Sequence, residues 1–259
     1  MSDAQEPLAL TALPAPQETL THTNWAGVDH ALGPATNAPE MLAGLLDTSQ
    51  AVRTRALHDV YGLLHHQNTI YPATVPTALY VAAILPDPRT TRSVDKDSQA
   101  FPGNIRAELL AWVDSVGTAV TDEADASGRR IGFPLDEDPP SVAVRAIRPL
   151  LFSAALDYVD DTDRYVREAA IAACIPLADD PRLRRHRADL VPLVRQVLGS
   201  SQLWQHRERA IDALDAWGED SSGLEGQRNP FLFCDADLEP GSFAWRADSI
   251  EGCSEEPPF

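Results

Sequence analysis

Apolar residues recur along the middle of the chain at the spacing of amphipathic helices. After Ser49, they fall on one face of a helix: Val52, Ala56, Leu57, Val60, Leu63 and Leu64. Before the polar break at 47–49, Asn37 offers an N-cap to a shorter helix, whose apolar stripe is Met41, Leu42, Leu45 and Leu46. These residues predict a pair of helices joined by a tight turn.

Three further pairs are predicted in the same way. In the second, a helix over 74–85 is followed by one that begins at Pro102, with the apolar face Ile105, Leu109, Trp112, Val113 and Val116. The third has Val144, Ile147, Leu150, Leu151 and Ala155, then Tyr165, Val166, Ala169, Ala170, Ala173 and Cys174. The fourth has Leu190, Val191, Leu193, Val194, Val197 and Leu198, then Leu203, Ala210, Ile211, Leu214 and Trp217. Gly218 then stands where a helix C-terminus favours glycine.

A short sequence motif begins the second helix of three pairs. Its arginine is Arg53, Arg167 or Arg207, and each of these precedes an amphipathic stretch. Arg167 and Arg207 are 40 residues apart, which suits a two-helix repeat of about 40–47 residues. The second pair has only Ile105-Arg106 as a loose substitute. The pattern predicts an all-α chain in which about four helix pairs form one repeat domain over 24–218, with insertions near 86–101 and 121–140.

The segments outside the helix pairs are expected to be less regular. Residues 1–23 lack a steady apolar period, so we expect a flexible leader. Trp25, Val28 and Leu32 predict a short helix that caps the first repeat. The acidic stretch 121–140 is expected to be a loop. Residues 219–259 are acidic with interspersed aromatics and are expected to form either a flexible acidic tail or a C-terminal cap.

The charge narrows the classes of partner. The chain has 39 acidic and 21 basic residues and a formal net charge of −18, which disfavours nucleic acid and anionic lipid surfaces and favours a basic protein partner. Solubility alone is a competing explanation of such a balance. No apolar run reaches the length of a membrane span, and the N-terminus lacks a secretory pattern. We therefore expect a cytoplasmic protein whose oligomeric state the sequence leaves open.

The cysteines and histidines predict neither a disulfide framework nor a metal site. Cys174 lies on an alanine-rich helical face and is expected in the core, whereas Cys234 and Cys253 occupy the tail without metal-ligand spacing. His58 and His65 share a helical face but are about 10 Å apart along the helix axis, too far for one ion. No metal or cofactor is therefore predicted.

The helix pairs resemble HEAT repeats over residues 37–218. The resemblance is carried by Pro39, Pro149 and Pro192 inside the first helices and by the arginines that open the second helices. It implies a right-handed α-solenoid, an armadillo-like superhelix, in which an Asp near the turn and the Arg of the second helix form a ladder between units. The residues implied for this ladder are Asp47, Arg53, Asp163, Arg167 and Arg207. The fourth unit has Ser200 and Ser201 where the family has Asp, so the ladder is partial.

More narrowly, Trp25 with 33–36 and the segment 65–74 resemble HEAT-repeat proteins of high-GC bacteria. This narrower resemblance indicates no reaction. We expect a non-catalytic protein that binds another protein through outward positions of its second helices, because second helices line the concave surface of such arrays. The candidate contact residues are Arg55, His58, Asp59, Arg106, Arg164, Glu168, Arg209 and Asp212. An acidic inhibitor, such as an immunity protein against a basic toxin, and a regulatory adaptor both fit. The alternative is a HEAT-fold enzyme, such as a DNA glycosylase or a bilin-lyase-like protein.

Overall fold

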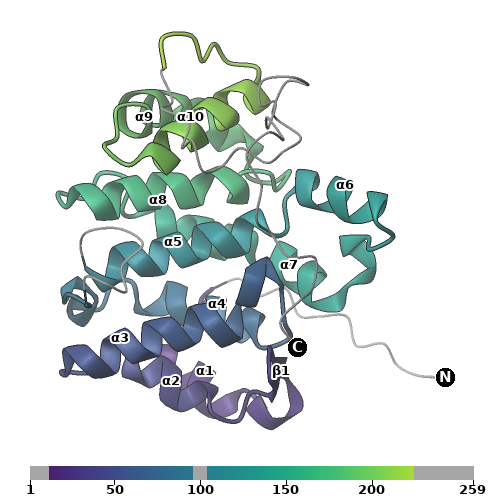
Figure 1. The fold of residues 1–259 in the computed structure, drawn as a ribbon, viewed down its shortest axis with the longest axis vertical. Coiled ribbons are helices and arrows are strands. Elements are labelled where there is room, and N and C mark those ends of the chain that lie inside the picture. Colours follow the sequence, from purple (N-terminus) through teal and green to yellow (C-terminus); the bar gives the residue numbers. More distant parts are fainter. Residues whose placement is uncertain (1–11, 96–103, 225–259) are drawn as a thin grey trace, which may run out of the picture.

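The computed structural model describes residues 12–95 and 104–224. Within them, helices predominate, and the strands of the one small sheet have two residues each. Figure 1 shows the helices arranged along the long axis of the molecule, with α1, α2 and α3 at one end and α9 and α10 at the other. The all-α prediction is confirmed.

The N-terminal segment is more regular than a flexible leader. Residues 1–11 and 225–259 lie outside the described residues, so about half of the predicted leader and most of the predicted tail are not described. The helix α1 (Pro16–His22) begins with proline in its first turn and contacts α4. It places Leu20 and the buried Thr19 against the rest of the fold, so the leader prediction is wrong for this segment.

The expected capping helix is replaced by a 3₁₀ turn and a hairpin. The turn η1 (Trp25–Gly27) is followed by β1 (Asp29–His30) and β2 (Gly33–Pro34), which pair antiparallel. Gly33 has a φ of 111°, a conformation that glycine adopts readily. Trp25 is buried as expected and its indole Nε1 donates to the carbonyl of Leu20 at 3.1 Å, but Leu32 is exposed because it stands in the hairpin turn.

The first predicted helix pair is present. It consists of α2 (Ala38–Gly44) and α3 (Gln50–Asp59), which continues as a π-helical turn η2 (Val60–Leu64) and the 3₁₀ turn η3 (His66–Asn68). Gly44 allows α2 and α3 to approach closely, because a Cβ at this position would lie 3.1 Å from the Cβ of Ala56. Most of the predicted apolar stripe is buried, although Val52 remains half exposed.

The second and third pairs form the centre of the molecule. The second comprises α4 (Thr74–Ile84), the 3₁₀ turn η4 (Pro88–Thr91) and α5 (Ile105–Thr118). Asn104 caps α5 by accepting from the Ala107 amide, so the helix begins later than Pro102, which lies outside the described residues. The third comprises α7 (Pro139–Leu156) and α8 (Arg164–Leu177). The first helices of the two pairs, α4 and α7, pack on each other, and so do their second helices, α5 and α8.

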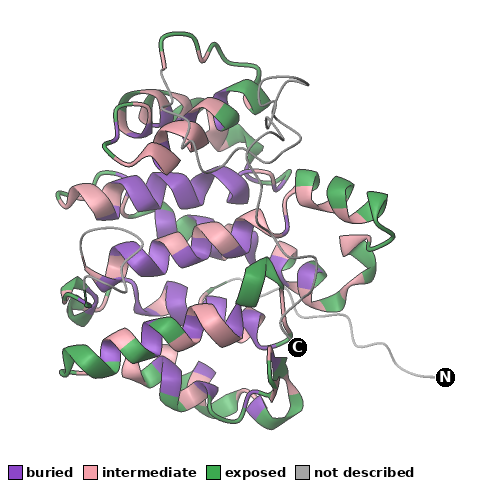
Figure 2. Ribbon diagram, in the orientation of Figure 1, coloured by how far each residue is buried: buried purple, intermediate pink, exposed green. Residues whose placement is uncertain are grey.

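The interface between α5 and α8 is especially close. Gly117 of α5 lies against α8, since a Cβ there would be 3.2 Å from side-chain atoms of both Pro176 and Leu177. Figure 2 shows α8 buried along most of its length, and Cys174 is fully buried on it, as the alanine-rich pattern predicts. Small side chains let the two helices share one core.

The predicted acidic loop contains a helix. The helix α6 (Asp122–Arg130) and the 3₁₀ turn η6 (Leu135–Glu137) occupy this segment. Thr121 caps α6, acidic residues stand in its first turn and Arg129 and Arg130 in its last, an arrangement that matches the helix dipole. None of its residues is buried, and the helix projects from the stack (Figure 1). The loop prediction is wrong because it required an apolar stripe, whereas capping and end charges favour this helix.

The last pair closes the described part of the chain. The 3₁₀ turn η7 (Arg184–His186) leads into α9 (Arg187–Leu193), which continues as a π-helical turn η8 (Val194–Leu198). The helix α10 (Trp204–Trp217) packs on η8 and α8. Gly218 ends α10 with a φ of 74°, as predicted for a left-handed C-terminal residue.

Candidate protein-binding surface

The three arginines that open second helices bind backbone carbonyls of the preceding turn. Arg53 Nη1 donates to the Asp47 carbonyl at 2.9 Å, and Arg167 Nη1 donates to the Asp161 carbonyl at 2.6 Å. Arg207 Nη1 donates to the Ser201 carbonyl at 2.5 Å. Each acceptor lies six residues before its arginine. A backbone carbonyl is available at any residue, which explains how the fourth unit keeps the contact without an Asp.

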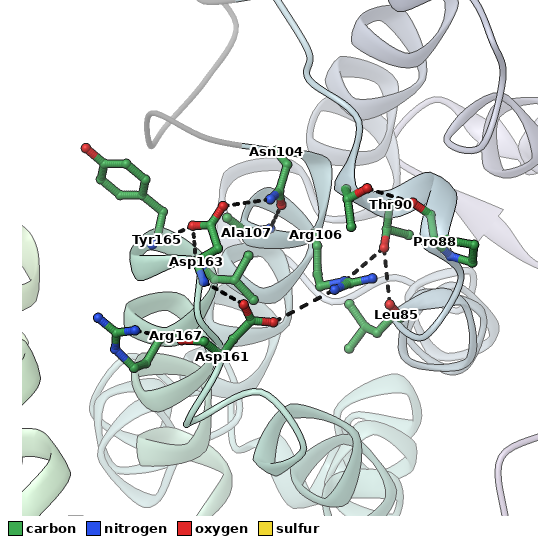
Figure 3. A network of polar contacts seen from close by, with 12 residues as sticks. Leu85, Pro88, Thr90, Asn104, Arg106, Ala107, Asp161, Asp163, Tyr165 and Arg167 are labelled. Atoms are coloured by element: carbon green, nitrogen blue, oxygen red, sulfur yellow. Dashed lines mark hydrogen bonds and ion pairs between the residues drawn. The ribbon is translucent and has the colours of Figure 1, made fainter.

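The carboxylates implied for the ladder have other partners. Asp47 Oδ1 accepts from the Ser49 amide at 2.7 Å. Asp163 caps α8 by accepting from the amides of Tyr165 and Val166, and its Oδ2 accepts from Asn104 Nδ2 at 3.0 Å (Figure 3). The contact between units at this point is therefore between Asn104 and Asp163, and the implied Asp–Arg ion pairs are not the contacts found.

Arg106 links units and is not a surface contact. Its Nε donates to Thr90 Oγ1 at 2.9 Å, and its Nη1 lies 3.8 Å from the Asp161 carboxylate (Figure 3). The guanidinium also lies over the Tyr158 ring, 5.0 Å from its centre. With its side chain only 13% exposed, Arg106 connects η4 and the turn before α8, contrary to its candidate role as an outward residue.

Glu168 is likewise a buried residue of the interface between α8 and α10. Its side chain is 2% exposed and accepts from Ser201 Oγ at 2.6 Å and His206 Nδ1 at 3.0 Å. Arg164 Nε donates to the other carboxylate oxygen at 2.6 Å. Burial by itself would raise the pKa of Glu168, but hydrogen bonds from His206, Arg164 and Ser201 outweigh burial and lower it to about 2. Glu168 therefore remains ionised inside the fold and is not available to a partner as expected, whereas Arg164, with its side chain 35% exposed, pairs with it from the surface.

Arg209 joins α10 to α5. Its Nη2 donates to both carboxylate oxygens of Asp114, at 3.1 and 2.9 Å, and to Thr118 Oγ1 at 3.2 Å. Burial raises the pKa of Asp114 even though Arg209 favours its ionised form. The side chains of α5 and α10 therefore meet on one face of the molecule, beside the buried α8.

Three of the remaining candidate residues are exposed, and Asp59 is partly buried, with its side chain 18% exposed. Arg55 and His58 are exposed on α3, and Asp212 is exposed on α10. Arg55 Nε lies 2.9 Å from Asp59 Oδ1, one helical turn away. An open hollow of about 670 Å³ lies beside this part of α3. Its lining is Gln50, Ala51, Thr54, Arg55, His58 and Asp95.

The arginines of the described residues are committed to contacts within the chain. Those that bind carboxylates include Arg182, which pairs with Asp180, and Arg187, which pairs with Asp179. Others bind carbonyls, as Arg145 does with Val120 and Thr121. Because the chain has 39 acidic and 21 basic residues, the net charge that it presents to a partner is negative.

His65 has a role that the sequence did not reveal. Its Nε2 is 2.9 Å from Ser115 Oγ on α5 and its Nδ1 is 3.1 Å from the Thr69 carbonyl, while its ring meets Trp112 edge-on. The carbonyl can only accept, so Nδ1 carries a hydrogen. The following residues Gln67 and Asn68 have φ values of 50° and 60°, and the histidine holds this strained turn against α5.

We expect His65 to make stability depend on pH. Burial lowers its pKa, outweighing the contacts with Thr69 and Ser115. The folded state thus binds fewer protons than the unfolded chain, so the free energy of unfolding should fall as pH drops below the ordinary histidine pKa of about 6.5. His65→Gln should reduce that slope, measured by urea unfolding from pH 7.5 to 5.5, whereas the exposed His66→Gln should not. Equal slopes in the wild type and His65→Gln would contradict the assignment.

The described residues contain neither a membrane-spanning helix nor a cluster of metal ligands. None of their helices combines the length and apolar content needed to cross a bilayer. In the same residues, no group of three or more His, Cys, Asp or Glu side chains is arranged to hold a metal ion. Comparisons of the chain with protein-family models, curated protein sequences and solved structures find no match.

Proposed function

We propose that this chain is a non-catalytic protein-binding scaffold, a HEAT-like right-handed α-solenoid whose second helices present an acidic surface to a basic partner protein. An inhibitor of a basic toxin and a regulatory adaptor both fit this role. The observation that supports the proposal best is that the arginines of the described residues bind other groups of the same chain. Guanidinium groups bind turns, carbonyls and carboxylates of the fold, which leaves accessible carboxylates to meet a partner.

The packing order of the helices supports the solenoid. The contacts α4 with α7 and α5 with α8 join equivalent helices of consecutive pairs, and α10 contacts α8 in turn. The repeated arginine-to-carbonyl contact adds a second similarity between units, because it has the same six-residue separation in three of them. A repeat array in which each unit contacts its neighbours has this form.

The competing proposal, a HEAT-fold DNA glycosylase, is less well supported. Such an enzyme needs a positively charged groove for the phosphate backbone. The arginines that would line one are Arg53, Arg106, Arg167 and Arg207, and each donates hydrogen bonds to backbone or side-chain oxygens of this fold. These contacts hold the guanidinium groups within the fold, and Arg53 is buried, which disfavours their use on a phosphate backbone.

Affinity capture from extracts of the native host tests the proposal. The full-length chain should retain a basic protein at low salt and release it at high salt, because charge steering is screened by ions. The double variant Glu208→Gln/Asp212→Asn removes two carboxylates from α10 and should bind the partner more weakly. The matched control Asp157→Asn/Asp189→Asn removes two carboxylates at the end of α7 and on α9.

Comparison of the two variants shows whether a captured protein binds to α10 or responds only to the net charge of the chain. Weaker retention by the α10 variant alone would support the second helices as the binding surface. Equal retention by both variants, or capture of no basic protein that salt releases, would overturn the proposal. Circular dichroism of each variant establishes that it is folded.

A further inference from the structure

A polar hollow lies between α8 and the turn that precedes α10. It is open to solvent and has a volume of about 350 Å³. Arg164 and Arg167 line its α8 side, and they are neighbours on the helix surface because they stand three residues apart. The other residues that line it are Glu168 of α8, Gln196 and Val197 of η8, and Ser200 and Gln202 of the turn. We call this cavity the arginine hollow.

The arginine hollow offers hydrogen-bond donors that have no partner among the described residues. Arg167 uses Nη1 to donate to the Asp161 carbonyl, and Arg164 uses Nε to donate to Glu168. The remaining guanidinium nitrogens of both arginines and the amide groups of the two glutamine side chains make no hydrogen bond within the described part of the chain. The glutamines are exposed and the arginines are partly exposed, so these donors are accessible to a ligand.

The lining of the hollow is positively charged, although the chain as a whole is acidic. The carboxylate of Glu168 is 2% exposed and already accepts three hydrogen bonds. Asp160, Asp161 and Asp163 precede α8 but do not line the hollow. The carboxylates of Asp161 and Asp163 contact residues at the start of α5 instead (Figure 3). Two guanidinium groups of the lining thus meet one carboxylate that is already hydrogen-bonded, which favours a second anion.

Comparison of two successive turns indicates which anion is missing. The turn before α8 and the turn before α10 correspond at a spacing of 40 residues, and Ser201 stands where the earlier turn has Asp161. Asp161 places its carboxylate 3.8 Å from Arg106 of the preceding second helix. The turn 199–203 contains no acidic residue, so it offers no carboxylate to the arginines of α8. A carboxylate also matches a guanidinium fork, because it can accept two parallel hydrogen bonds.

We infer that the arginine hollow binds a carboxylate ligand, which the free guanidinium nitrogens of Arg164 and Arg167 hold by charge-assisted hydrogen bonds. The amides of the two glutamines stand beside them as neutral donors. Such a carboxylate belongs to a small organic acid or to an acidic side chain of a peptide, and the hollow recognises the same group in both. The site goes beyond the proposed binding of a basic protein, because Glu208 and Asp212, which test that proposal, do not line the hollow.

Isothermal titration calorimetry of the full-length chain tests the inference with two probes. Glutarate represents a free organic acid, and an acetylated, amidated Gly-Glu-Gly peptide represents an acidic side chain. Binding of either probe supports the site, and the probe that binds more tightly identifies the source of the carboxylate. The matched Gly-Gln-Gly peptide should bind about tenfold or more weakly than Gly-Glu-Gly, because it lacks the charge. Tighter binding of inorganic phosphate than of either carboxylate probe would overturn the assignment to carboxylates.

Substitutions separate this site from a general attraction of anions. Gln202→Glu places a carboxylate in the hollow itself and should weaken binding of the probes about tenfold or more. Gln17→Glu makes the same change on the exposed surface of α1, at the other end of the molecule (Figure 1), and should bind like the wild type. Arg167→Gln removes one guanidinium group and should weaken binding to a similar extent, with circular dichroism to verify its fold. A wild type that binds neither probe at millimolar concentrations, or a Gln202→Glu variant that binds as tightly as Gln17→Glu, would overturn the inference.

Discussion

Replacement of Glu168 by alanine should destabilise the fold by about 3–5 kcal/mol, the range for removing one partner of a buried ion pair. The carboxylate accepts from Ser201, His206 and Arg164. Without it, His206 and Ser201 face each other inside the protein with an acceptor missing. The loss should appear as a lower urea midpoint for Glu168→Ala, and Glu208→Ala on the surface of α10 provides the comparison.

The same residue should contribute to acid sensitivity. Its folded pKa of about 2 is below the ordinary glutamate value of 4.5, so the folded state binds fewer protons than the unfolded chain between these two pH values. The stabilisation by Glu168 is therefore present above about pH 4.5 and is lost as pH falls towards 2. Glu168→Gln should lack this component, and its stability difference from the wild type should shrink across that window. A constant difference from pH 6 to pH 3 would contradict the ionised assignment.

Replacement of Arg106 by alanine should cost about 2–3 kcal/mol, because hydrogen bonds from a charged donor are lost at a mostly buried position. The change leaves Thr90 and Asp161 without their guanidinium partner and removes the packing on Tyr158. The reduced stability should be measurable by thermal and urea unfolding. It should be accompanied by faster amide hydrogen exchange in η4 and in the turn before α8, which Arg106 joins.

Two further variants test whether the loss of stability in Arg106→Ala comes from the contacts of its guanidinium group. Arg106→Lys keeps the charge but cannot reproduce the planar fork, so it should fall between alanine and the wild type. Arg55→Ala removes an exposed pair one turn apart on α3 and should change stability by less than about 0.5 kcal/mol. If Arg106→Ala were as mild as Arg55→Ala, Arg106 would not connect the units as described.

The candidate contact residues show why surface positions are harder to predict than core positions. Periodicity correctly places Leu57, Trp112 and Cys174 in the core, since burial of an apolar stripe follows from local spacing. The same periodicity leaves Arg106 and Glu168 on the polar side of their helices. The structure buries Glu168 and leaves Arg106 only 13% exposed, because Arg106 lies close to Asp161 and Glu168 meets Ser201 and His206, and these partners come from other helix pairs.

Local sequence by itself determined the helix pairs, the all-α class and the end of α10 at Gly218, because helical periodicity and capping involve residues within a few turns of one another. Only the tertiary structure decided which polar residues stay accessible. It also decided that the ladder arginines bind backbone carbonyls and that Ile131 and Phe133, which follow α6, are exposed. Those outcomes depend on the path of the backbone through the turns and on which side chains from distant segments come within reach, and the spacing of residues along one helix does not contain that information.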